Sequence, residues 1–174
     1  FVFGGSQGAQ SLNEGVPRAL RALSLEQLSK IRVLHQTGRG KLEETKQVYA
    51  DCACADFRLS EFIDDMGAAY SWADLVICRA GATSIAEITS LGKASVLVPF
   101  PFAAHGHQDK NADAMVAYGA SWKIGNDRIE ADLPEVIDNC LSDRSLLVEK
   151  GQRALAKGKP RASHEVAQSL LELL

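Results

Sequence analysis

The sequence lacks any long hydrophobic run. A membrane-spanning helix needs roughly 18 or more apolar residues in succession, and no stretch of this chain approaches that length. The most apolar stretch, residues 94–104, is interrupted by Pro99 and Pro101. No secretory signal peptide is visible either. We therefore expect no segment of this chain within a bilayer.

A basic patch is also missing. The 19 lysine and arginine residues are scattered singly, and with 22 acidic residues they give a formal net charge of -3. Proteins that bind nucleic acid gather their positive charge on one face or along one helix to meet the phosphate backbone. The sequence therefore predicts no nucleic-acid partner.

Cysteine is scarce, and the four cysteines match neither a zinc site nor a disulfide framework. Cys52 and Cys54 form one close pair, whereas a zinc ribbon needs two CxxC pairs. Cys78 falls in an apolar run, and Cys140 falls on the apolar side of a helical pattern. We predict small buried or loop cysteines in a reducing, cytoplasmic setting.

The sequence does contain a regular alternation of short apolar strands and amphipathic helices. Its 174 residues, 46% of them hydrophobic, are enough for a single well-buried core. Six strands interleaved with helices indicate an α/β fold, with a doubly wound six-stranded parallel sheet of Rossmann-like type and a helical C-terminal tail. Strands are predicted at residues 1–3, 31–35, 57–59, 75–78, 95–98 and 120–124. Helices are predicted from Gly8 through Leu23, at 41–50, 64–72, from Thr83, at 107–118, at 133–141 with Asp132 as its cap, at 145–156 and at 163–173.

Two glycine-containing turns follow the first and fourth predicted strands. In a doubly wound sheet, ligands bind outside the carboxyl ends of the strands, where these turns lie. Each turn leads into a helix whose first N–H groups lack partners within the helix and whose dipole favours an anion. Two such helix starts suit a diphosphate. The expected ligands are Gly5, Ser6, Gln7 and Gly8 in the first turn and Gly81, Ala82 and Thr83 in the second.

Polar groups from three other segments are expected to reach the same crevice. Glu87 lies within the first two turns of the helix that follows Gly81, and a carboxylate beside an anion site indicates a ligand that also carries a diol, such as a ribose. Uncharged amides suit the hydroxyls of a sugar. The crevice is therefore predicted to bind a nucleotide diphosphate that carries a sugar. The remaining candidates are the loop of residues 60–63 and the side chains of His105, His107, Gln108 and Asn111.

Four motifs occur in these segments in a fixed order. They are Gly4-Gly5-Ser6-Gln7-Gly8-Ala9 with Asn13, Glu61-Phe62-Ile63-Asp64-Asp65-Met66, Cys78-Arg79-Ala80-Gly81-Ala82 with Glu87, and His107-Gln108-x-x-Asn111-Ala112. Together they closely resemble the C-terminal half of the MurG family, bacterial N-acetylglucosaminyltransferases that convert lipid I to lipid II in peptidoglycan synthesis. The resemblance covers essentially the whole chain, and four motifs in order make it specific.

The resemblance implies that residues 1–174 form the donor-binding C-terminal domain of a GT-B glycosyltransferase. The implied reaction is an inverting displacement, in which a hydroxyl of the lipid-linked muramyl acceptor attacks the anomeric carbon of UDP-N-acetylglucosamine and UDP leaves. Ser6 and the N–H groups of its turn would hold a phosphate, joined by the backbone at Ala82 and Thr83. The charge of the leaving group would be held by fixed dipoles rather than by a metal, which agrees with the lack of a DxD motif, and no cofactor is expected.

The resemblance also assigns the remaining candidates to parts of the donor. The backbone of Ile63 would pair with the uracil edge, and Glu87 would accept hydrogen bonds from the ribose hydroxyls. His107 and Gln108 would reach the hydroxyls of the sugar, with Asn111 close by. His107 stands where some family members carry glutamine.

Other parts of the implied enzyme lie outside this sequence. The chain begins inside a predicted strand without an initiator methionine, so we expect a fragment of a longer protein. In the MurG family the N-terminal half supplies the proposed general base, the lipid I site and the membrane-facing surface. We expect this fragment to bind donor without turnover, and the whole protein to lie peripherally on the inner face of the cell membrane.

Several alternatives fit single features. Gly4-x-Ser6-x-Gly8 also satisfies the GxSxG nucleophile elbow of serine hydrolases, with Asp64 or Asp65 and His105 or His107 as partners, but this function leaves Glu87 unexplained. An NAD-binding module would need GxGxxG spacing and an acid that binds the ribose at the end of the second strand, which instead reads His35-Gln36-Thr37. A UDP-N-acetylglucosamine epimerase-like domain would share the donor, and the motifs around Ile63 and Gln108 favour the transferase. A non-catalytic nucleotide-sugar binder is the remaining alternative.

Each site residue also has a structural explanation. Ser6 could cap the helix that follows it, and Glu87 could be a solvated helix residue. The two histidines could be ordinary loop residues. Arg79 is left open between contact with a phosphate and pairing with a carboxylate.

Overall fold

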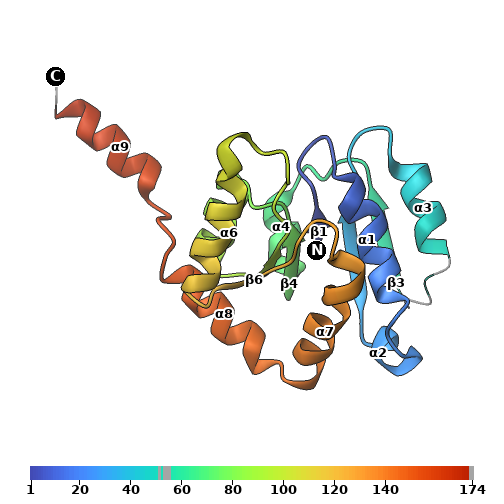
Figure 1. Ribbon diagram of the computed structural model, residues 1–174. Helices are drawn as coiled ribbons and strands as arrows, with labels where there is room; N and C mark the ends of the chain where they lie inside the picture. The colour runs from blue at the N-terminus through green and yellow to red at the C-terminus, as the bar shows by residue number, and fades with distance from the viewer. Residues whose placement is uncertain (51, 53–55, 173–174) are drawn as a thin grey trace.

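A single parallel sheet forms the centre of the computed structural model, which describes residues 1–50, 52 and 56–172 (Figure 1). The strand order is β3-β2-β1-β4-β5-β6, and every neighbouring pair is parallel. Because the order reverses between β1 and β4, the predicted doubly wound, six-stranded sheet is confirmed. The strands are β1 (Val2–Phe3), β2 (Arg32–Gln36), β3 (Asp56–Ser60), β4 (Leu75–Cys78), β5 (Ala94–Leu97) and β6 (Ser121–Lys123).

Helices cover both faces of this sheet (Figure 1). On one face α1 (Gln10–Leu20) packs against α3 (Leu42–Ala50) and α7 (Ile129–Ser142). The other face is covered by α4 (Met66–Trp72), α5 (Ala82–Leu91), α6 (His107–Ala117) and α8 (Ser145–Leu155). Of the C-terminal helices, α7 and α8 pack onto the body, whereas α9 (Ala162–Leu171) projects away from it (Figure 1).

The sheet divides the hydrophobic core into two clusters, rather than the single core that the composition suggested. Strand β4 explains the division, because successive side chains of a strand point to opposite faces. Ile77 belongs to the cluster under α1 and α7, while Val76 and Cys78 belong to the cluster under α4, α5 and α6. Every position of β4 therefore has to be apolar, because both faces of the sheet are buried, as in other parallel sheets.

Two helical segments differ from the predicted boundaries. Leu23 lies beyond the end of α1, in the turn before a short helix, α2 (Leu25–Ser29), which the sequence analysis did not predict. Helix α7 begins at Ile129 rather than at residue 133, because Ile129 is buried against Gly15 of α1. Asp132 therefore lies in the first turn of α7 and is not its cap; it forms an ion pair with Arg128 at 2.7 Å.

The remaining expectations concern cysteines and membrane spans. Cys52, Cys78 and Cys140 are buried, as predicted, while Cys54 and Leu173 lie outside the described residues. Over the described parts of the chain, no helix combines the length and the apolarity that crossing a bilayer requires. Within the same residues, no group of three or more His, Cys, Asp or Glu side chains is arranged to hold a metal ion.

Candidate functional site

The glycine turn (residues 4–8) connects β1 to α1 at the C-terminal edge of the sheet. The Gly8 N–H donates to the Gly5 carbonyl at 3.0 Å, and both residues have positive φ, 84° at Gly5 and 66° at Gly8. Gly5, Ser6 and Gln7 are exposed. Helix α1 begins after Ala9 with no side chain capping it, so the prediction that Ser6 could be a cap is wrong. An exposed turn beside uncapped N–H groups favours an anionic ligand.

The start of α5 forms a second, similar feature. Gly81 is its N-cap residue, with φ −69°, and again no side chain caps the helix. Ala82 and Thr83 are exposed in the first turn. Because β1 pairs with β4, with Phe3 opposite Cys78, the two uncapped helix starts follow adjacent strands. The predicted diphosphate ligands are therefore brought to one edge of the sheet.

Glu87 is held by a buried tyrosine. The Tyr70 hydroxyl donates to Glu87 Oε2 at 2.7 Å, and the Tyr70 side chain is 1% exposed. Burial, together with this hydrogen bond, raises the pKa of Tyr70 and keeps the phenol protonated as a donor. Among the described residues nothing donates to the other oxygen, Oε1. Glu87 is therefore a half-buried carboxylate that Tyr70 orients, and its Oε1 has no hydrogen-bond donor among the described residues.

The β3 loop (residues 60–63) is fastened to the β2 turn (residues 36–40). Thr37 N–H donates to the Ser60 carbonyl at 2.8 Å, and Gly38 N–H donates to the Glu61 carbonyl at 3.1 Å. The Ile63 N–H donates to Gln36 Oε1 at 2.9 Å. Since this N–H is engaged, the carbonyl is the backbone group of Ile63 that is available to a ligand.

The predicted sugar-binding side chains lie in the first two turns of α6. His107 Nδ1 lies 2.6 Å from the Ala104 carbonyl, and Gln108 Oε1 accepts from the Phe100 N–H at 2.9 Å. Asn111 Nδ2 donates to the Ala80 carbonyl at 3.1 Å, which ties α6 to the turn after β4. Each side chain thus has one polar atom fixed by the protein and another left for a ligand. His105 is exposed in the left-handed region, with φ 52°.

Arg79 follows β4 and does not pair with a carboxylate in the described part of the chain, so that alternative is wrong. Its Nη1 donates to Val98 O at 3.1 Å, Pro99 O at 3.2 Å and Asn126 Oδ1 at 2.8 Å, and its Nη2 donates to Ser11 Oγ at 2.8 Å. Burial lowers the pKa of Arg79, and the charge lies beside an open pocket of about 540 Å³. This pocket is also lined by Gly4, Gly8, Gln10, Lys41 and Phe102.

A buried polar network lies beneath the glycine turn. His35 Nε2 lies 3.0 Å from Asn13 Oδ1, and His35 Nδ1 lies 3.0 Å from the Tyr49 hydroxyl. Asn13 Nδ2 donates to the Thr37 carbonyl at 2.9 Å, which assigns Oδ1 as an acceptor for His35 Nε2–H. Burial lowers the pKa of His35 to about 3, so the ring is neutral and joins α1 to the β2 turn.

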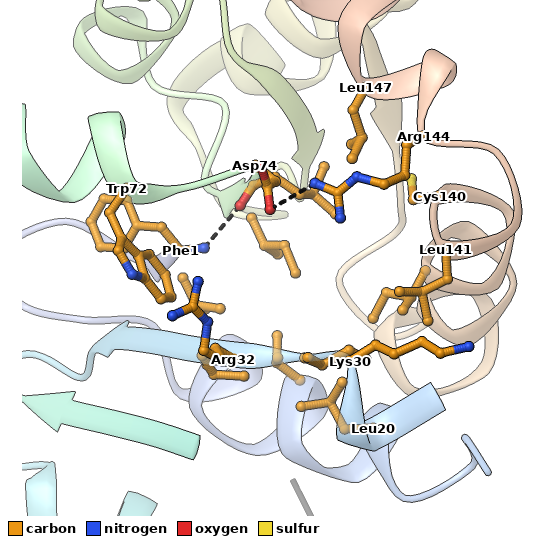
Figure 2. Close-up of a pocket in the computed structure, with 17 residues that line it drawn as sticks. Phe1, Leu20, Lys30, Arg32, Trp72, Asp74, Cys140, Leu141, Arg144 and Leu147 are labelled. Carbon is orange, nitrogen blue, oxygen red and sulfur yellow. Dashed lines mark hydrogen bonds and ion pairs between the residues drawn. The ribbon is translucent and has the colours of Figure 1, made fainter. Parts of the chain in front are cut away.

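A second cavity, of about 250 Å³, opens at the opposite edge of the sheet, where β1, β2 and β4 begin (Figure 2). Its wall includes Asp74, paired with Arg144 at 3.0 Å, and Arg32 beside the ring of Trp72. None of the predicted site residues lines it. This cavity is therefore separate from the predicted site residues.

Two residues of the site were not identified from sequence. Gln36 was noted only because it is not an acid, and Tyr70 was not assigned to the crevice. The position of Gln36 at the end of a central strand was a usable signal, since such ends face the crevice. The contact of Tyr70 with Glu87 joins residues 17 positions apart on two helices and has no signal in one sequence.

The serine hydrolase alternative finds no catalytic arrangement here. Among the described residues Ser6 forms no hydrogen bond with either histidine, and His107 Nδ1 faces the Ala104 carbonyl instead. A nucleophile elbow requires the serine and its base within hydrogen-bonding reach.

The reversed strand order, the glycine turn after β1 and the uncapped helix after β4 define a Rossmann-like α/β domain with its ligand crevice at the switch point. The chain belongs to the glycosyltransferase family 28 C-terminal domain family, whose model matches residues 1–166.

Similar proteins share one function by name. The UDP-N-acetylglucosamine--N-acetylmuramyl-(pentapeptide) pyrophosphoryl-undecaprenol N-acetylglucosamine transferase of Nitratidesulfovibrio vulgaris (strain DP4) is 43% identical, over 100% of this chain and 47% of the relative. The protein of that name from Trichlorobacter lovleyi is 44% identical, over 99% of this chain and 45% of the relative. This chain thus spans about half the length of the curated relatives it matches.

Solved structures agree with this assignment. The crystal structure of Acinetobacter baumannii MurG superposes with a TM-score of 0.85 at 34% identity, over 98% of this chain and 48% of that one. A glycotransferase of kitacinnamycin superposes with a TM-score of 0.65 at 21% identity, which shows a common fold. The fold is therefore that of one half of a GT-B glycosyltransferase, as the sequence predicted.

Proposed function

We propose that this chain is the donor-binding half of an inverting glycosyltransferase that moves N-acetylglucosamine from UDP-N-acetylglucosamine to lipid I, the undecaprenyl-diphosphate-linked muramyl-pentapeptide, to make lipid II. The observation that carries the proposal is the pair of adjacent, uncapped helix starts with the oriented carboxylate of Glu87 on the second helix. Membership of family 28 and the names of the relatives support the choice of donor and acceptor. Residues 1–174 would form a single donor domain, with the acceptor domain outside this chain.

Different segments at the C-terminal edge of the sheet are proposed to bind different parts of the donor. The diphosphate lies between the glycine turn and the start of α5, with Gly5, Ser6, Gln7 and Gly8 on one side and Gly81, Ala82 and Thr83 on the other. The Ile63 carbonyl accepts the imide N–H of uracil, and Glu87 Oε1 accepts from a ribose hydroxyl. The sugar is met by the free ring nitrogen of His107, by Gln108 Nε2 and by Asn111 Oδ1.

These contacts supply electrostatic stabilisation rather than acid-base chemistry. As the acceptor hydroxyl bonds to the anomeric carbon, the bond to the β-phosphate oxygen breaks and UDP leaves with its electron pair. The charge that develops on the diphosphate is met by two preorganised helix starts, which need not reorient during the reaction. The proton of the acceptor hydroxyl passes to a base in the acceptor half. That half would also bind lipid I and hold the protein peripherally at the inner membrane face.

Calorimetric titration of this chain tests the proposal. UDP-N-acetylglucosamine, UDP and NAD are titrated without metal and again with magnesium. Binding of the two uridine ligands but not of NAD, with little dependence on magnesium, is the expected result. No uridine binding by a chain that circular dichroism shows to be folded would contradict the proposal.

Glu87→Ala is expected to weaken UDP binding by about 1–3 kcal/mol, or roughly 5- to 150-fold, because a ribose hydroxyl loses its acceptor. Titration calorimetry on UDP and on 2′- and 3′-deoxy analogues measures the effect. For the analogue that lacks the contacted hydroxyl, the substitution should cause a smaller loss of affinity than it causes for UDP.

Tyr70→Phe is the matched control for Glu87→Ala. It removes the same internal hydrogen bond, of 2.7 Å, but keeps the carboxylate. It should retain most of the affinity for UDP while lowering the thermal unfolding midpoint. Unchanged UDP affinity in a folded Glu87→Ala variant would remove Glu87 from the ligand contacts.

A further inference from the structure

Gln36 joins two parts of the site that are far apart in sequence. It is the last residue of β2 and is 3% exposed. Its Nε2 donates to the Gly5 carbonyl at 3.1 Å, and its Oε1 accepts from the Ile63 N–H at 2.9 Å. Both halves of the amide are therefore used, one on the glycine turn and the other on the β3 loop.

The two partners lie on opposite sides of β2. Strands β1 and β3 both pair with β2, so the segments that follow them are about 10 Å apart, two strand spacings. In the proposed function the glycine turn holds the diphosphate and the β3 loop holds the base. A uridine diphosphate must therefore cross the end of β2, where Gln36 lies.

The β3 loop has several attachments to the β2 turn, whereas the glycine turn has few. Besides the backbone bonds of Thr37 and Gly38, the Gly40 N–H donates to Glu61 Oε1 at 2.8 Å. Among the described residues, the bond from Gln36 to the Gly5 carbonyl is the only hydrogen bond between the glycine turn and either of these segments. Gly8 otherwise meets the β2 turn through close backbone packing.

We propose that Gln36 is a positioning residue, which fixes the distance between the diphosphate-binding turn and the base-binding loop without touching the ligand. The inference rests on the proposed function of these two segments. It predicts a specific pattern: a ligand that contacts both segments depends on Gln36 more than a ligand that contacts one. It also accounts for the missing acid at this strand end. The side chain at position 36 bonds two segments of the protein, whereas the acid of an NAD-binding module would bond to a ribose.

Gln36→Glu is the most selective variant, since a carboxylate keeps the acceptor for the Ile63 N–H and loses the donor to the Gly5 carbonyl. At pH 8 we expect UDP to bind about tenfold or more weakly, and uridine to lose less than about threefold. Calorimetry measures UDP, and NMR titration measures uridine. Position 36 is buried, and the Gly5 carbonyl can accept only from a protonated carboxyl, so both effects raise the pKa of the new carboxyl above its usual value. As the pH is lowered towards 5 the carboxyl therefore takes up a proton and can donate again, and UDP affinity should approach that of the wild type at the same pH.

Gln47→Glu is the control for replacing an amide by a carboxylate. Gln47 is exposed on α3, lines neither of the two pockets, and bonds neither the glycine turn nor the β3 loop. The variant should leave UDP affinity within about threefold of the wild type, with no recovery at low pH. A loss of UDP affinity in Gln47→Glu equal to that in Gln36→Glu would show that added charge alone accounts for the effect, and would overturn the proposal.

Gln36→Leu is the second variant, which removes both bonds without adding charge. Thermal unfolding shows whether the variant folds. Its affinity for UDP should again fall by a larger factor than its affinity for uridine. Unchanged UDP affinity in a folded variant, or equal losses for UDP and uridine, would refute the positioning role. Failure of the wild type itself to bind UDP would instead refute the proposed function, and the inference with it.

Discussion

Gly8→Ala is expected to lower the free energy of unfolding by about 3 kcal/mol and to weaken UDP binding about tenfold or more. The residue has φ 66°, which disfavours any side chain, and a Cβ at this position would lie 1.9 Å from the Thr37 carbonyl oxygen. That oxygen belongs to the backbone of the β2 turn. It can move away only if the turn moves, and the β3 loop moves with it. Urea unfolding and UDP titration measure the two effects.

Gly40→Ala is the matched control for the steric part of this prediction. Gly40 has a similar φ of 72°, but a Cβ there would meet nothing within 4 Å. The free energy of unfolding of this variant should fall only by the conformational strain, about 1–2 kcal/mol, and its UDP affinity should be unchanged. Similar losses of UDP affinity in both variants would show that strain, rather than contact between the two turns, determines the effect.

Acidification is expected to destabilise the protein through His35. The pKa of this ring is lowered to about 3 by burial, whereas an unfolded chain has a histidine pKa of about 6.5. The unfolded state therefore binds the proton first, so the contribution of His35 is fully present above about pH 6.5 and is lost as the pH falls. The slope approaches 1.4 kcal/mol per pH unit, or about 3 kcal/mol between pH 6.5 and 4.

His35→Gln separates this contribution from that of the carboxylates. Glutamine can supply a donor and an acceptor at the same place but does not titrate. Urea unfolding at pH 7, 6, 5 and 4 measures the free energy of unfolding of both proteins. Below pH 6 this free energy should fall less steeply in the variant, by about 1 kcal/mol per pH unit. Parallel declines in the two proteins would show that His35 is not held neutral in the folded state.

The strands were predictable because each is a short apolar run that ends in a turn. Residues 75–78 form β4 with the predicted limits, since burial on both faces leaves little freedom of composition. Helix α2 was missed although its signal is present: Ser24 and Gln27 form a reciprocal capping box. Its five residues are too few to show a helical period. The start of α7 was missed because the burial of Ile129 depends on Gly15, which lies far away in the sequence.

The candidate site was predictable in its location but not in its internal contacts. The rule that ligands meet the carboxyl ends of parallel strands brought the glycine turn, the start of α5 and the start of α6 together. It could not show that Arg79 would bond to the Val98 and Pro99 carbonyls rather than to a carboxylate. Such partners depend on side-chain direction and on loop shape, which local sequence does not determine. The same limit hid the contact between Tyr70 and Glu87.

The attachment of the β3 loop to the β2 turn has a consequence for the energetics of binding. Ordering one backbone residue costs about 1–2 kcal/mol of conformational entropy. The Thr37 and Gly38 N–H groups bond to the Ser60 and Glu61 carbonyls within the protein itself. This ordering is completed during folding, so a nucleotide that meets the loop does not have to restrict it again. Affinity at this edge can therefore come from relatively few contacts. The Thr37, Gly38 and Ile63 amides, which donate the hydrogen bonds between the β2 turn and the β3 loop, should exchange slowly with solvent deuterium in protein to which no nucleotide has been added.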